Sequence, residues 1–154
     1  MTMQKENGTV QLLTFKLDDQ EYALKTANVV QVTRMVAMVR PPKSSEFIEG
    51  VFNLRGSVYP VINIRKLFGL PAKTYDMNTH LLIAQSDSHT MALAVDVVSE
   101  VLTMLSQHLE EPERIGVQNG YLSAVGKIGS RLILILNPNA FLAGEPNRAQ
   151  GNLA

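Results

Sequence analysis

Histidine is the side chain best suited to proton transfer near neutral pH, and the chain contains only three, His80, His89 and His108. Their spacing matches no short zinc-binding motif. A Ser-His-Asp arrangement could be drawn from Ser88, His89 and Asp96. However, the sequence lacks the G-x-S-x-G turn that presents the serine of many hydrolases. We therefore expect no catalytic residue, and a small hydrolase is the weakest of the functional hypotheses.

Other common chemistries also lack their residues. Glu110, Glu111 and Glu113 are interrupted by Pro112, which is typical of a solvated acidic loop rather than of an acid–base pair. The chain has no cysteine, which excludes disulfides, thiol catalysis and cysteine zinc sites. It also lacks the G-x-x-x-x-G-K-[ST] loop that cradles phosphates. We expect neither a metal nor a cofactor.

The composition is that of a globular protein. Of the 154 residues, 45% are hydrophobic and 18% charged, and 14 basic residues balance 14 acidic ones. A net charge of zero gives no reason to expect a nucleic-acid or acidic-membrane partner. No apolar run approaches the roughly 20 residues of a membrane helix. The first residues do not resemble a signal peptide, so the expected compartment is the cytoplasm.

Alternation of apolar and polar residues dominates the chain and predicts many short strands, as in an all-β barrel or sandwich. Expected strands cover residues 10–17, 22–24, 29–32, 80–84, 91–95, 97–102, 121–128 and 131–136, with helical turns near 64–68 and 138–142. Two further apolar stretches, 50–54 and 58–64, flank a turn at Arg55-Gly56-Ser57, where Gly56 can adopt a positive φ.

Arg55 is the one cation beside this turn. If it were buried, it would need a carboxylate, backbone carbonyls or a partner protein, because a buried unpaired charge is costly. A purely structural arginine that holds the turn is the alternative.

Adjacent apolar pairs occur at Leu12-Leu13 and Val29-Val30. Consecutive residues of a strand face opposite sides, so one member of each pair points away from the centre of its own barrel. That residue must either pack between two barrels or line an exposed groove.

The run from residue 47 to 70 resembles the signature of the CheW-like domain, the adaptor of bacterial chemotaxis arrays. The matching residues are Gly50, Val51, Asn53, Leu54, Arg55, Gly56, Pro60, Val61, Asn63 and Arg65. The opening segment VQLLTFKLDDQEYAL, the middle segment DVVSEVLTM and the closing segment YLSAVGKIGSRLILILNPNAFL also resemble the family. The resemblance implies an all-β fold of two small five-stranded SH3-like barrels, packed into one compact unit with short helical turns. We expect intertwined barrels in residues 9–143, a flexible N-terminus in 1–8 and a flexible tail in 144–154.

The resemblance further implies a non-enzymatic adaptor that couples chemoreceptor signalling tips to the regulatory domain of a CheA-type histidine kinase. It would work at membrane-associated receptor arrays without entering the membrane. A CheW-like scaffold of another kinase pathway, such as surface motility, is the alternative. A groove for the coiled-coil receptor tip would be lined by Leu13, Val29 and Val32, with Val98 and Val101 opposite.

The expected kinase surface departs from the family at one position. Relatives often have an acidic residue in the third strand, where this chain has Gln31, so a charge pair made there would be missing. The contact would then depend on Val36, Met38 and Val39, and methionine suits an adaptable protein-binding surface. Asn53, Arg55 and Gly56 are expected to anchor the hairpin that positions these surfaces, or to contact the partner directly.

Overall fold

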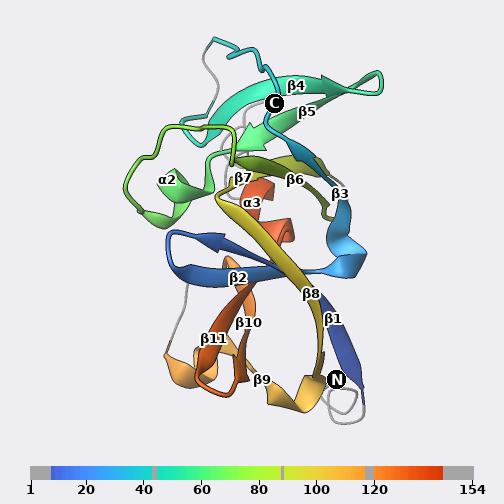
Figure 1. Ribbon diagram of the computed structural model, residues 1–154, viewed down its shortest axis with the longest axis vertical. Coiled ribbons are helices and arrows are strands. Elements are labelled where there is room, and N and C mark those ends of the chain that lie inside the picture. The colour runs from blue at the N-terminus through green and yellow to red at the C-terminus, as the bar shows by residue number, and fades with distance from the viewer. Residues whose placement is uncertain (1–7, 43–44, 88, 117–119, 144–154) are drawn as a thin grey trace.

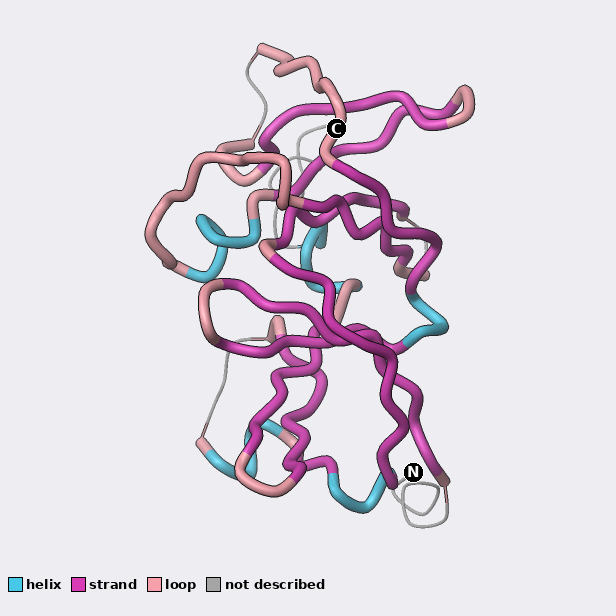
Figure 2. The backbone as a smooth tube through the Cα atoms, viewed as in Figure 1, coloured by secondary structure: helices cyan, strands magenta, loops and turns pink. Residues whose placement is uncertain are grey.

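The computed structural model describes residues 8–42, 45–87, 89–116 and 120–143. It consists of two β-sheets in two lobes stacked along the long axis of the molecule (Figure 1). The backbone trace is mostly strand, with helices of at most a turn or two (Figure 2). The all-β prediction is therefore confirmed. Apart from Gly8, the ends expected to be flexible lie outside the described residues.

One sheet, here called the first barrel, has the strand order β8-β1-β2-β11-β10-β9. Its strands are β1 (Thr9–Leu17), β2 (Gln20–Lys25), β8 (Val97–Leu105), β9 (Leu109–Glu110), β10 (Leu122–Ile128) and β11 (Arg131–Leu136). The 3₁₀ turns are η1 (Thr26–Asn28), η2 (Ser106–His108) and η3 (Pro112–Ile115), and the helix α3 (Asn139–Ala143) follows β11. The two-residue β9 is an addition to the five strands that the resemblance implied.

The other sheet, the second barrel, has the order β3-β6-β7-β5-β4. Its strands are β3 (Val29–Arg34), β4 (Ile48–Leu54), β5 (Ser57–Ile62), β6 (His80–Gln85) and β7 (Thr90–Val95). The helix α2 (Ile64–Phe68) follows β5. It begins where Asn63 Oδ1 accepts the Lys66 N–H and ends at Gly69 with φ 75°. Both ends of the chain build the first barrel, and the middle builds the second.

Three apolar clusters explain how the barrels pack. The first-barrel core comprises Leu12, Ala23, Met104, Ala124, Ile133 and Ile135. The second-barrel core comprises Phe52, Val61, Leu81, Ile83, Ala92 and Ala94. The inter-barrel core, which draws on both sheets, comprises Leu13, Phe15, Leu17, Tyr22, Leu24, Ile62, Ile64, Leu82, Ala84, Met91, Leu93, Val95, Leu136 and Phe141. Successive residues of β6 and β7 face the second-barrel and inter-barrel cores in turn, which is why these strands read as continuous apolar runs.

The apolar pairs of the sequence resolve in different ways. Leu12 lies in the first-barrel core, and its neighbour Leu13 packs between the barrels. Val29 packs against the inter-barrel core, whereas Val30 is 49% exposed. Packing between the barrels, one of the two alternatives expected from sequence, therefore occurs at Leu13.

Candidate protein-binding surfaces

Two strands carry apolar residues from the inter-barrel core to the molecular surface. On β8, Val98 is half-buried against that core and Val101 is 54% exposed. On β3, Val29 is half-buried against the same core and Val32 is 38% exposed. We call these four residues the inter-barrel surface. Apolar area of this kind is costly to leave in water and is typical of a protein-binding site.

A β-bulge in each strand makes this surface possible. Residues three apart in a regular strand face opposite sides, which would separate Val98 from Val101 and Val29 from Val32. The register of β8 against β1 shifts by one residue, so that Val98 and Val101 lie opposite Phe15 and Leu13 on the same face.

The register of β3 against β6 shifts in the same way. Val29 lies opposite Ala84 and Val32 lies opposite Leu82, and both partners belong to the inter-barrel core. Val30 is the additional residue of this bulge.

The predicted groove residues are thus graded in depth. Leu13, directly opposite Val101 on the neighbouring strand, is only 9% exposed and packs in the inter-barrel core, which corrects its assignment to an open groove. Val29 and Val98 lie at intermediate depth, and Val32 and Val101 lie at the surface. Leu105, which was not predicted, is 45% exposed at the end of β8.

A second apolar surface lies on the outer side of the second barrel. Val39 forms an antiparallel bridge to Val51 of β4, with N···O distances of 2.9 and 2.7 Å in the two directions. Because Val51 pairs with Pro60 and Asn53 pairs with Val58, these side chains share one face of the sheet. Val39 and Val58 are 69% and 62% exposed. We call Val39 and Val58, together with Val36, which is 38% exposed in the segment before Val39, the outer surface.

The methionines of this segment face inwards. Met35 and Met38 pack against the second-barrel core, whereas Val36 and Val39 are exposed. Met38 lies so close to Gly50 that a Cβ there would be 2.8 Å from the Met38 Sδ atom. Met38 therefore anchors the outer surface from below, and Gln31 is half-buried opposite Ile83.

The β4–β5 hairpin has the predicted turn. Arg55 and Gly56 are its two central residues, with φ of 53° and 87°, as in the type I′ turn that suits twisted hairpins. Asn53 Oδ1 accepts the Gly56 N–H at 3.1 Å, so Asn53 anchors the turn. Arg55 is exposed, and no carboxylate of the described residues is within ion-pair distance of it. Because Arg55 is not buried, it does not need a partner for its charge.

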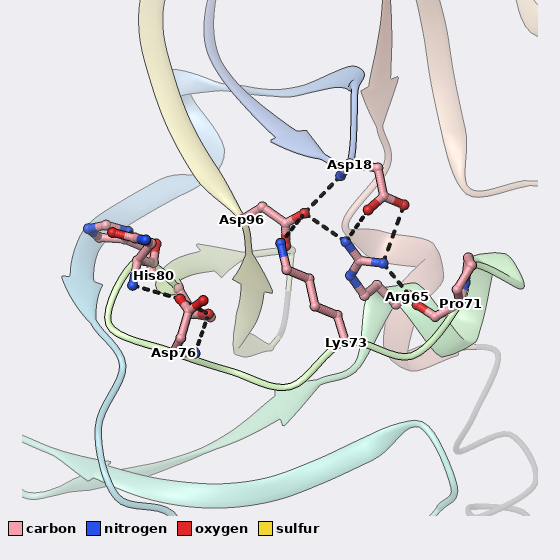
Figure 3. Close-up of polar contacts among 9 residues, drawn as sticks. Asp18, Arg65, Pro71, Lys73, Asp76, His80 and Asp96 are labelled. Carbon is pink, nitrogen blue, oxygen red and sulfur yellow. Dashed lines mark hydrogen bonds and ion pairs between the residues drawn. The ribbon is translucent and has the colours of Figure 1, made fainter.

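The arginine with buried ion pairs is Arg65, at the start of α2 (Figure 3). Its side chain is only 7% exposed. The guanidinium donates to both carboxylate oxygens of Asp18 (2.7 and 3.3 Å), to Asp96 Oδ2 (2.7 Å) and to the Pro71 carbonyl (2.8 Å). Lys73 Nζ lies 3.4 Å from Asp96 Oδ2. The sequence analysis did not predict this cluster. The available signal was that Arg65, like Arg55, lies among apolar residues.

These contacts shift the ionisation of the cluster. Hydrogen bonds to Asp18, and also to Asp96, raise the pKa of Arg65 despite its burial. Burial alone would raise the pKa of Asp96. The hydrogen bonds from the Asp18 N–H and from Arg65 outweigh it and hold the Asp96 pKa below its usual value. Arg65 and Asp96 are therefore both charged at neutral pH.

Two of the residues considered for catalysis have other partners in the structure. Asp96 is paired with Arg65 and Lys73, and Ser88 lies outside the described residues. His80 Nδ1 lies 2.9 Å from the carbonyl oxygen of Asn78. In the part of the chain that the structure describes, no group of histidine and acidic side chains could hold a metal ion.

Comparison with known proteins identifies the family. The profile of the CheW-like domain matches residues 11–145, nearly the whole chain. The chain belongs to the CheW-like domain family. It is an adaptor of chemotaxis and not an enzyme.

Relatives of the CheW family cover most of the chain. The chemotaxis protein CheW of Helicobacter pylori is 29% identical over 141 residues, which are 90% of this chain and 86% of that protein. CheW of Bacillus subtilis is 29% identical over 153 residues, or 97% and 96% of the two chains. The crystal structure of the scaffolding protein TtCheW from Thermoanaerobacter tengcongensis is similar with a TM-score of 0.78 and 27% identity. That match covers 84% of this chain and 90% of the other. No helix among the described residues is long and apolar enough to cross a membrane.

Proposed function

We propose that this CheW-family adaptor couples chemoreceptor signalling tips to the regulatory domain of a CheA-type histidine kinase. The observation that carries the proposal is the presence of two separate apolar surfaces on one scaffold. The inter-barrel surface takes the receptor tip, and the outer surface takes the kinase. Binding both partners at once raises the concentration of each near the other, which is how an adaptor without chemistry of its own can act.

The chemistry of each surface suits its proposed partner. A coiled-coil tip presents apolar side chains in repeating rows, and Val29, Val32, Val98 and Val101 offer it an apolar surface that continues into the inter-barrel core. The family's acidic position is occupied by Gln31, which is half-buried opposite Ile83. Kinase binding therefore depends on apolar contact with Val36, Val39 and Val58.

Two exposed valines of the same strand, β8, provide a matched test of the receptor site. Val101 and Val97 are 54% and 48% exposed, but Val97 lies opposite Lys16 and hence on the other face of the strand. Val101→Glu should weaken binding of a purified receptor cytoplasmic fragment by more than about tenfold, or 1.4 kcal/mol, because the new charge would be buried in the complex. Val97→Glu should leave that affinity unchanged. Equal affinities of the two variants, measured by titration calorimetry, would contradict the assignment.

The kinase site has its own test. Val39→Glu should weaken binding of the kinase regulatory domain and leave receptor binding intact, since Val39 belongs to the second barrel's outer face. Leu132→Glu is the control, because Leu132 is equally a large exposed residue but lies on β11 of the first barrel. Kinase binding that survives Val39→Glu at full strength would exclude the outer surface.

A further inference from the structure

The cluster of Arg65, Asp18 and Asp96 joins segments of both barrels at one edge of their interface (Figure 3). Arg65 comes from α2, directly after β5 of the second barrel. Asp18 lies in the β1–β2 turn of the first barrel, and Asp96 lies where the chain passes from β7 of the second barrel to β8 of the first. The cluster therefore ties together the two barrels and one of the segments that connect them.

Backbone groups take part in the same cluster. The Asp18 N–H donates to Asp96 Oδ2 at 2.8 Å, and Asp18 itself has the left-handed φ of 57° that is common in tight turns. The Asp96 N–H donates to the Lys16 carbonyl at 3.1 Å. Asp96 is thus held through its side chain and its backbone. The next residues of the chain begin β8, which carries Val98 and Val101 of the inter-barrel surface.

We propose that Arg65 is a positioning residue that fixes the orientation of the two barrels, and with it the relation between the two partner-binding surfaces. The inter-barrel core holds the barrels together, but apolar burial has no preferred direction. A guanidinium that bonds a carboxylate with two nitrogens does have one, since its donors form a rigid fork. Arg65 thus supplies the geometry and the core supplies the attraction.

The chain offers a matched control for this role. Arg131 also bonds one carboxylate with two nitrogens, those to Glu21 at 2.9 and 2.8 Å, and reaches a second at Glu100. All three residues belong to the first barrel, on β11, β2 and β8. Replacing Arg131 by lysine therefore removes a two-nitrogen contact of the same kind from within the first barrel. It should leave the orientation of the two barrels unchanged.

The orientation can be measured directly because the chain has no cysteine. Ser57→Cys and Ser130→Cys place spin labels on exposed residues at the β4–β5 turn of the second barrel and the β10–β11 turn of the first. Figure 1 shows these two hairpins in different lobes. Electron–electron double resonance then reports the distance distribution between the barrels. In the parent we expect one narrow distribution. Arg65→Lys keeps the charge but loses the fork, and Asp18→Asn keeps the turn and loses the charge, so both should broaden the distribution or add a second population.

Arg131→Lys should give the distribution of the parent. Unchanged distributions in folded Arg65→Lys and Asp18→Asn, or equal broadening in Arg131→Lys, would overturn the proposal. Should Arg65→Lys fail to fold, Asp18→Asn decides, because its side chain is half exposed and asparagine tolerates a left-handed φ. The claim that Arg65 fixes the barrel orientation stands by itself. The claim that this orientation sets the relation between the two partner-binding surfaces rests on the proposed function. The distances are measured without either partner, so a failure of receptor or kinase binding leaves this result intact.

Discussion

Thr14 Oγ1 donates to the carbonyl oxygen of Glu100 at 3.0 Å and accepts the Glu100 N–H at 3.2 Å. Thr14 is completely buried, and Glu100 lies in the bulge where β8 slips against β1. One hydroxyl therefore satisfies both backbone groups that the bulge removes from the ladder. The bulge in turn places Val98 and Val101 on one face, so Thr14 supports the inter-barrel surface from the opposite strand.

Thr14→Val should destabilise the protein by about 1–3 kcal/mol, because it keeps the shape of the side chain and leaves two backbone groups without a partner. The free energy of unfolding in urea measures this. Thr103→Val is the control, since Thr103 is exposed on the neighbouring strand β8 and its substitution should change stability by at most about 0.5 kcal/mol. Equal effects of the two substitutions would show that the Thr14 hydroxyl does not matter.

Arg55→Asn should stabilise the hairpin by about 1 kcal/mol, because asparagine tolerates the left-handed φ of 53° better than arginine does. The melting temperature tests this. Kinase and receptor affinities measured on the same variant decide the second question. A more stable variant that binds a partner at least about tenfold more weakly would show that Arg55 contacts that partner, whereas unchanged affinities would leave it with no role beyond the turn.

Gly50→Ala should weaken kinase binding and spare receptor binding. The new Cβ would lie 2.8 Å from Met38 Sδ and 2.9 Å from the backbone carbonyl oxygen of Val39, and the latter cannot rotate away. The segment that carries Val36 and Val39 must therefore move off β4. Titration of the variant with each partner separately measures the effect. Loss of both interactions together would point to general unfolding instead.

Acid should remove the contribution of the inter-barrel ion cluster. The Asp96 pKa is held below its usual value in the folded protein, so the stabilisation is fully present above the unfolded pKa of about 3.9 and is lost as the pH falls below it. The difference in unfolding free energy between the parent and Asp96→Asn should be largest near neutral pH and should shrink below about pH 4. A difference that does not vary with pH would contradict a charged Asp96 in the folded state.

The fold was accessible from the sequence because its signals are local. Alternation located most strands, and the Arg-Gly pair located the turn of the β4–β5 hairpin. The continuous apolar runs of β6 and β7 are explained only by the structure, in which both faces of these strands are buried.

The site was less accessible, because it depends on long-range register. A sequence shows that Val98 and Val101 are three residues apart, which by itself predicts opposite faces, and nothing local reveals the bulges that reverse this. The same limit explains the arginines. Arg55 and Arg65 both lie among apolar residues, and only the contacts across the barrels show that Arg65 is the buried one.

The most direct measurement of the central claim is the recruitment of the kinase regulatory domain to an immobilised receptor fragment by the adaptor. The parent should recruit the kinase, and Val101→Glu and Val39→Glu should each abolish recruitment. A mixture of the two variants should fail as well, because each molecule retains only one of the two surfaces. Full recruitment by either variant alone, or by their mixture, would contradict a single chain that bridges both partners through these surfaces.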